Sequence, residues 1–120
     1  MTVKTGLPGH FVQIRAKYQK FFEALDELGI SAKQEGPLEE RTAHLVQLAA
    51  SAAIRSEGAV HSHTRRALEA GAAPEEIYHT IILLTSTIGF SNVAAALSWV
   101  EDILEDKPER QVGQRNACPR

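Results

Sequence analysis

The side chains best suited to chemistry gather in one short polar stretch, residues 56–63, which reads Ser-Glu-Gly-Ala-Val-His-Ser-His. Glu57 offers a carboxylate there, and His61 and His63 offer imidazoles, which can exchange protons near neutral pH. Two positions along a helix correspond to a rotation of about 200°. His61 and His63 therefore point to different sides of a helix, and we expect them not to face the same site.

Metal and thiol chemistry receive little support from the sequence. His61 and His63 form an H-x-H pair, which is a possible metal-binding pattern. However, the sequence has no HExxH motif, no second H-x-H pair and no cysteine cluster. We therefore predict no metal and no cofactor. The single cysteine, Cys118, forms no internal disulfide, and nothing near it in the sequence would activate the thiol.

Two further patterns surround this stretch. A polar stripe precedes it at spacings of three and four, and consists of His44, Gln47 and Ser51. It is either a solvated helix face or the wall of a cleft. His63 shares a helix face with small residues four positions apart, which are Ala59, Ala67 and Gly71. His63 is therefore either a packed structural histidine or the centre of a site, with Glu57 placed to orient it. A short connection favours antiparallel helices, which would set the stripe opposite His63.

Five helices are expected to position these residues, and no segment alternates as a strand does. They cover residues 8–28, 37–55, 57–70, 74–88, and a last segment that Ser91 or Asn92 caps and that ends before Lys107. Gly29 is expected to end the first helix, and residues 31–36 to form a polar linker. Gly71 should close the third helix. The sequence therefore predicts an all-α domain over residues 1–107 and a flexible basic tail over residues 108–120.

Composition excludes several classes of protein. A chain of 120 residues is expected to be a single domain, and its net charge of −2 argues against nucleic-acid binding. No apolar run approaches the roughly 20 residues of a membrane span, and the first residues lack the apolar segment of a signal peptide. We expect a cytoplasmic protein. Its small core and alanine-rich helix faces predict a homo-oligomer.

Several short sequence elements resemble a known family. They are residues 38–49 (LEERTAHLVQLA), 56–72 (SEGAVHSHTRRALEAGA) and 74–77 (PEEI). In order and spacing they are similar to the carboxymuconolactone decarboxylase / alkylhydroperoxidase D family, whose redox members read C-E-G-C, a histidine and then A-L-x-x-G-A. The resemblance covers about residues 38–104. It implies a helical bundle that assembles as a trimer or hexamer.

The family cysteines correspond to Ser56 and Ala59. The resemblance implies that in the redox relatives the thiol at the Ala59 position attacks and the thiol at the Ser56 position resolves or relays. The histidine at the His63 position assists proton transfer there. A chain without these thiols has no disulfide cycle. The decarboxylase branch needs no cysteine pair. The resemblance implies a histidine at the His63 position and charged groups that hold a carboxylated lactone, but that branch typically has glutamate where this chain has Ala59.

Three functions remain open. The favoured one is a non-redox acid/base enzyme, or a binder of a small carboxylated ligand, centred on His63 with His44, Glu57 and His61 as candidate partners. The second is a catalytically silent structural or regulatory oligomer. The third is an alkylhydroperoxidase-type peroxidase, which the loss of the cysteine pair disfavours.

Overall fold

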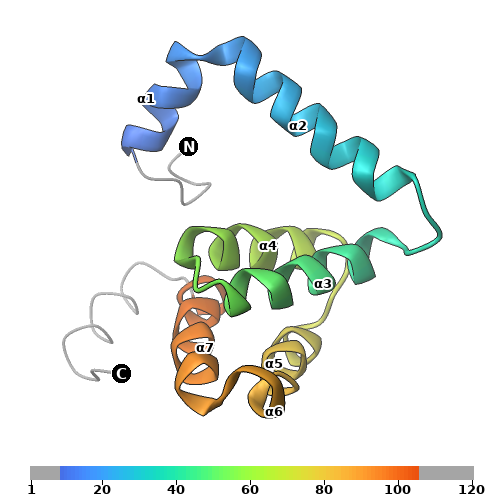
Figure 1. Cartoon of the computed structure of the whole chain (residues 1–120), viewed down its shortest axis with the longest axis vertical. Helices are drawn as coiled ribbons and strands as arrows, with labels where there is room; N and C mark the ends of the chain where they lie inside the picture. Colours follow the sequence, from blue (N-terminus) through green and yellow to red (C-terminus); the bar gives the residue numbers. More distant parts are fainter. Residues whose placement is uncertain (1–8, 106–120) are drawn as a thin grey trace. The chain divides into compact units, whose positions relative to one another are not determined.

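A computed structural model describes residues 9–105, and this part of the chain contains helices but no strand (Figure 1). The helices are α1 (Gly9–Lys17), α2 (Gln19–Gln34), α3 (Glu40–Ala53), α4 (Glu57–Glu69), α5 (Pro74–Ile82), α6 (Thr85–Ile88) and α7 (Phe90–Leu104). The predicted all-α class is confirmed. The chain divides into two compact units, one up to Pro37 and one from Leu38 onward.

The first unit contains α1 and α2. A single helix was expected up to Gly29, but the backbone leaves the helical region at Tyr18 (φ −121°, ψ 54°), and α2 then continues through Gly29 to Gln34. The predicted linker over 31–36 is therefore wrong for most of its length, because a glycine inside a helix costs only about 1 kcal/mol and does not force an end. An ion pair connects the two helices, because the Arg15 guanidinium lies 2.6 Å from a carboxylate oxygen of Asp26.

In the second unit, α3 and α4 form a hairpin joined by residues 54–56. Arg55 has a left-handed backbone conformation (φ 57°), which is uncommon for a residue with a Cβ. Its guanidinium donates to Oδ1 of Asn92 and lies 6.0 Å from the ring centroid of Trp99, so contacts with α7 hold the strained turn in place. Ser56 then caps α4, because its hydroxyl accepts the backbone N–H of Ala59 at 3.3 Å.

The end of α4 agrees with the prediction at Gly71. This residue has φ 101°, and its N–H donates to the carbonyl of Leu68. The next N–H, from Ala72, donates to the carbonyl of Ala67. These two bonds form a Schellman motif, which satisfies carbonyl groups at the helix end and relies on a residue that tolerates positive φ.

The segment predicted as one helix over 74–88 is instead two. α5 begins as expected at Pro74, with the Glu76 carboxylate accepting the N–H of Ala73 at 2.9 Å. After Ile82 the chain tightens into turns in which Leu84 donates to Ile81, and α6 follows. Hydrophobic periodicity continues through such a turn, so the pattern alone does not reveal it.

α7 begins at Phe90, after Gly89 with φ 89°. The predicted cap at Ser91 or Asn92 is wrong, because both residues lie inside the helix. The Asn92 side chain instead donates backward to the carbonyl of Ile88 at 2.6 Å. The predicted tail over 108–120, with Cys118, lies outside the described residues.

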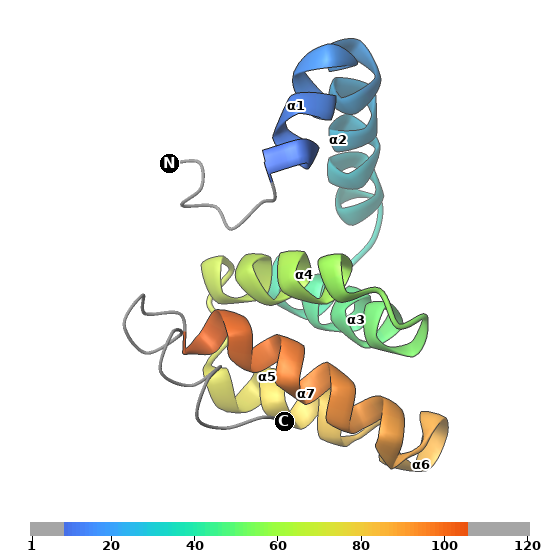
Figure 2. The ribbon, with the colours of Figure 1, turned by 90° about the vertical axis from the view of Figure 1, so that its left-hand side faces the viewer.

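The second unit has two layers, with the α3–α4 hairpin packed over α5 and α7 (Figure 2). Its core contains the buried residues Leu48, Ala52, Val60, Ala67, Ala72, Ile77, Ile81, Val93, Ala96 and Val100. α1 and α2 contribute no buried residue. Among the described residues, no helix combines the length and apolar character needed to cross a membrane.

Candidate functional site

Two histidines meet across the α3–α4 hairpin. Nδ1 of His44 lies 3.4 Å from Nδ1 of His63, and the ring centroids are 5.6 Å apart with planes tilted by 40°. His44 is almost completely buried, with 3% of its surface exposed, whereas His63 is partly exposed. A nitrogen-to-nitrogen hydrogen bond needs one donor and one acceptor, so the tautomer of one ring fixes that of the other.

A carboxylate lies on the other side of His44. Oε2 of Glu40 is 3.8 Å from Nε2 of His44, and the Glu40 side chain is 71% exposed. Glu40, His44 and His63 thus form a row that runs from an exposed carboxylate through a buried imidazole to a partly exposed imidazole. The 3.8 Å separation between Glu40 and His44 is too long for a hydrogen bond, so direct proton exchange within the row is limited to the His44–His63 contact.

Two buried side-chain oxygen atoms belong to residues that are close to this row in the sequence. Oε1 of Gln47, one helical turn after His44, and Oγ1 of Thr64, the residue after His63, are buried and have no hydrogen-bond partner within the described part of the chain. Ser51, the third member of the predicted stripe, is buried, and its hydroxyl donates to the carbonyl of Gln47 at 2.7 Å. The stripe is therefore not a solvated helix face at His44 and Ser51.

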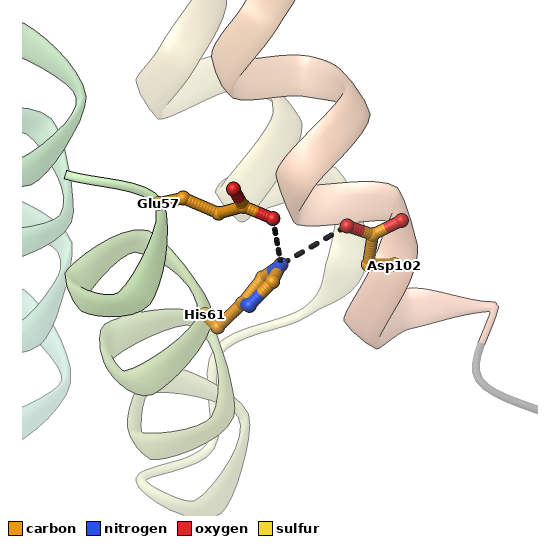
Figure 3. Close-up of side chains that lie close together, drawn as sticks. All are labelled: Glu57, His61 and Asp102. Carbon is orange, nitrogen blue, oxygen red and sulfur yellow. Dashed lines mark hydrogen bonds and ion pairs between the residues drawn. The ribbon is translucent and has the colours of Figure 1, made fainter. Parts of the chain in front are cut away.

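His61 faces a different neighbour. Its Nε2 lies 3.0 Å from Oδ2 of Asp102 on α7 and 4.0 Å from Oε2 of Glu57, one turn earlier on α4 (Figure 3). The predicted divergence of His61 and His63 is thus seen directly, because His61 turns to α7 and His63 to α3.

The four residues predicted for one site therefore form two separate pairs of contacts. His44 and His63 meet, as the antiparallel hairpin suggested. Glu57 contacts His61 rather than orienting His63. Sequence reasoning missed Glu40 as a partner of His44, although the spacing of four on one helix was a usable signal. It also missed Asp102, which is 41 residues from His61 in the sequence and carries no local signal.

The pKa of Tyr78 on α5 is shifted by its surroundings. Burial raises the pKa of Tyr78 above its ordinary value of 10.0, and the negative charges of Glu101 and Glu105 raise it further. The Tyr78 hydroxyl also donates to Oε2 of Glu101 at 3.4 Å. All three effects favour the protonated phenol.

The sequence model of the carboxymuconolactone decarboxylase family matches residues 16–102, which is most of the chain. The chain belongs to the carboxymuconolactone decarboxylase family. No curated protein matches it significantly.

Ser56, Ala59 and His63 lie at and near the start of α4. In this carboxymuconolactone decarboxylase family member, the Ser56 hydroxyl accepts the backbone N–H of Ala59 as the helix cap. His63, one turn beyond Ala59, contacts His44. Ser56 and Ala59 therefore contribute a capping hydroxyl and a methyl group at the start of the helix that carries His63.

Proposed function

We propose that this family member acts without thiols, as an acid/base enzyme or binder of small carboxylated molecules, and that His63 is its central residue. The observation that supports this most directly is the 3.4 Å approach of the His44 and His63 Nδ1 atoms. A second imidazole that is buried behind the first can hold it in one tautomer and one orientation. Both properties are needed for proton transfer to a substrate.

The proposed division of labour follows from exposure. His44 is buried and serves as the positioning residue, while the more exposed His63 is the group that touches the ligand. Because Nδ1 of His63 faces His44, its other ring nitrogen, Nε2, is the atom through which it would take or give a proton. The Glu40 carboxylate lies 3.8 Å from Nε2 of His44, the ring nitrogen that does not face His63.

Two arginines close to the pair in sequence are candidates to bind a carboxylate. Arg41 lies one turn before His44 on α3, and Arg66 lies one turn after His63 on α4. In an antiparallel hairpin that brings residues 44 and 63 together, these two arginines occupy neighbouring positions at the same end. Arg41 already pairs with Glu39 at 3.0 Å and with Glu76 at 3.8 Å. Arg66 is therefore the guanidinium that we propose would pair with a carboxylated substrate.

A ligand-induced thermal shift tests the proposal. The wild-type chain and His63→Ala are screened with a panel of carboxylated lactones and related organic acids. The matched control is His79→Ala, which removes an exposed histidine of α5. A ligand that stabilises the wild type should keep its effect in the control and lose it in His63→Ala.

Two results would contradict the proposal. One is an equal shift in His63→Ala and the wild type, which would put the ligand elsewhere. The other is the absence of any stabilising acid together with no turnover, which would favour a catalytically silent oligomer. Circular dichroism and light scattering on each variant separate loss of binding from loss of fold or assembly.

A further inference from the structure

The group formed by Glu57, His61 and Asp102 plays no part in the His44–His63 pair. We propose that these three side chains form a binding site for a first-row divalent transition metal, of which Zn²⁺ is the convenient probe. The site would join the first two turns of α4 to the last turn of α7 (Figure 3).

The distances suit a shared cation. Each residue offers one ligand atom, and the three atoms all lie within 4.8 Å of one another. The two contacts of His61 Nε2 are 3.0 Å to Asp102 and 4.0 Å to Glu57. Ligands about 2.1 Å from a tetrahedral metal lie roughly 3.4 Å apart, which falls between these two values. A modest rotation of the Glu57 side chain would bring its oxygen into range.

Burial indicates which ligands are already fixed. The side chains of His61 and Asp102 are 23% and 27% exposed, whereas Glu57 is 57% exposed. The packing of α4 against α7 therefore holds a nitrogen and an oxygen ligand together, and the more exposed carboxylate can close on the ion. Three protein ligands leave at least one coordination position for water, as in zinc sites that are open to solvent.

The donor set also narrows the choice of metal. Mg²⁺ and Ca²⁺ prefer oxygen ligands throughout, and an imidazole nitrogen instead favours zinc and its neighbours. The two carboxylates provide negative charge that a divalent cation would offset. The expectation of no metal rested on the absence of a second metal-binding motif beside the H-x-H pair. The structure instead places Glu57 and Asp102 next to His61. The competing explanation is a simple ion pair between protonated His61 and two carboxylates.

Metal titration of the full-length chain distinguishes these explanations. Zn²⁺ binding is followed by calorimetry in a buffer that does not chelate metal, and Co²⁺ is used as a spectroscopic probe of nitrogen and oxygen coordination. The wild type should bind one Zn²⁺ per chain and melt at a higher temperature when it is bound. His61→Gln and Asp102→Asn should each weaken binding by about tenfold or more, since even residues that only support a metal ligand typically contribute 10–100-fold.

Three controls isolate the site. His79→Gln removes an exposed histidine, and His63→Gln disrupts the His44–His63 pair. Cys118→Ser removes the only thiol. All three variants should keep the wild-type affinity for Zn²⁺. If Asp102→Asn fails to fold, Glu57→Gln at the exposed ligand gives the same test. The proposal is overturned if the wild type binds no Zn²⁺ or Co²⁺, if His61→Gln binds as well as the wild type, or if Cys118→Ser abolishes binding.

Discussion

Nδ1 of His44 on α3 faces Nδ1 of His63 on α4 across 3.4 Å, so a pair of imidazoles joins the two helices of one hairpin. The two Nδ1 atoms can share one proton, and a second proton between them would set two N–H donors against each other without an acceptor. Each ring can therefore take one of two tautomers, and the tautomer of one ring determines that of the other. Both rings lie on helices that pack against each other. Because His44 is buried, its contribution extends to the stability of the fold.

Replacing His44 should destabilise the protein. His44→Ala leaves a cavity between α3 and α4 and removes the group that Nδ1 of His63 faces. We expect the free energy of unfolding to fall by about 1–3 kcal/mol, as is usual when a buried hydrogen-bonding group is lost. Urea denaturation measures the change. His79→Ala, at an exposed position, should stay within about 0.5 kcal/mol of the wild type, and a similarly small change for His44→Ala would contradict the structural role.

The wild-type chain should not reduce peroxides at the expense of thiols. Ser56 caps α4 and Ala59 has no reactive group, so neither side chain can form a sulfenate or a disulfide. Peroxide consumption with dithiothreitol or a dihydrolipoyl donor should match the background rate. Robust turnover that disappears in Cys118→Ala would show instead that the single thiol is catalytic.

Two glycines of the second unit should respond in opposite directions to alanine. Gly71 has φ 101°, and Gly71→Ala should destabilise the protein by about 1 kcal/mol or more, because the Schellman motif needs that conformation. Gly58 lies inside α4 without a positive φ, and a Cβ added to it would meet no neighbouring heavy atom within 4 Å. Gly58→Ala should stabilise by about 0.4–1 kcal/mol. Thermal melting of both variants checks the pair, and destabilisation of both would contradict the assigned conformations.

Stability should fall on the alkaline side partly through Tyr78. Its pKa is raised in the folded chain by burial and by Glu101 and Glu105, so the unfolded chain loses the phenol proton first, near pH 10.0. The resulting stability is fully present below that pH and is lost as the pH rises from about 10 toward the higher folded pKa. Tyr78→Phe should show a shallower loss of stability over this window. Tyr18→Phe controls for loss of a phenol hydroxyl, and identical alkaline profiles for Tyr78→Phe and the wild type would refute the effect.

How much of this could be read from the sequence depended on the range of the interactions. Predictions from sequence were correct where residues adjacent in the chain determine the structure. Examples are the helix end at Gly71 and the opposite directions of His61 and His63. They failed at Tyr18 and after Ile82, where the backbone turns without interrupting the apolar period. Asp102 could not have been paired with His61 from sequence, because only the packing of α7 on α4 brings them together.

We expect the chain to assemble as a homo-oligomer, most simply a trimer or hexamer as the family resemblance implies. The physical reason lies in the apolar face of α2, where Phe21, Leu25 and Leu28 follow one another at helical spacing and are 61%, 47% and 65% exposed. No residue of α1 or α2 is buried. Burying such a face is worth about 25 cal/mol per Å² of apolar area, and a second copy of the chain offers a matching apolar face.

Light scattering at micromolar concentration should give a mass near three or six times 13.1 kDa. Phe21→Glu combined with Leu28→Glu should lower that mass, because a charge placed within an apolar interface loses hydration without gaining a partner. Lys20→Glu, a charge change at an exposed position of the same helix, should leave the assembly intact. A wild-type mass of a single chain would refute the oligomer. An unchanged mass in the double variant would instead assign the contact to another surface, since it would show that the apolar face of α2 is not what the copies bury.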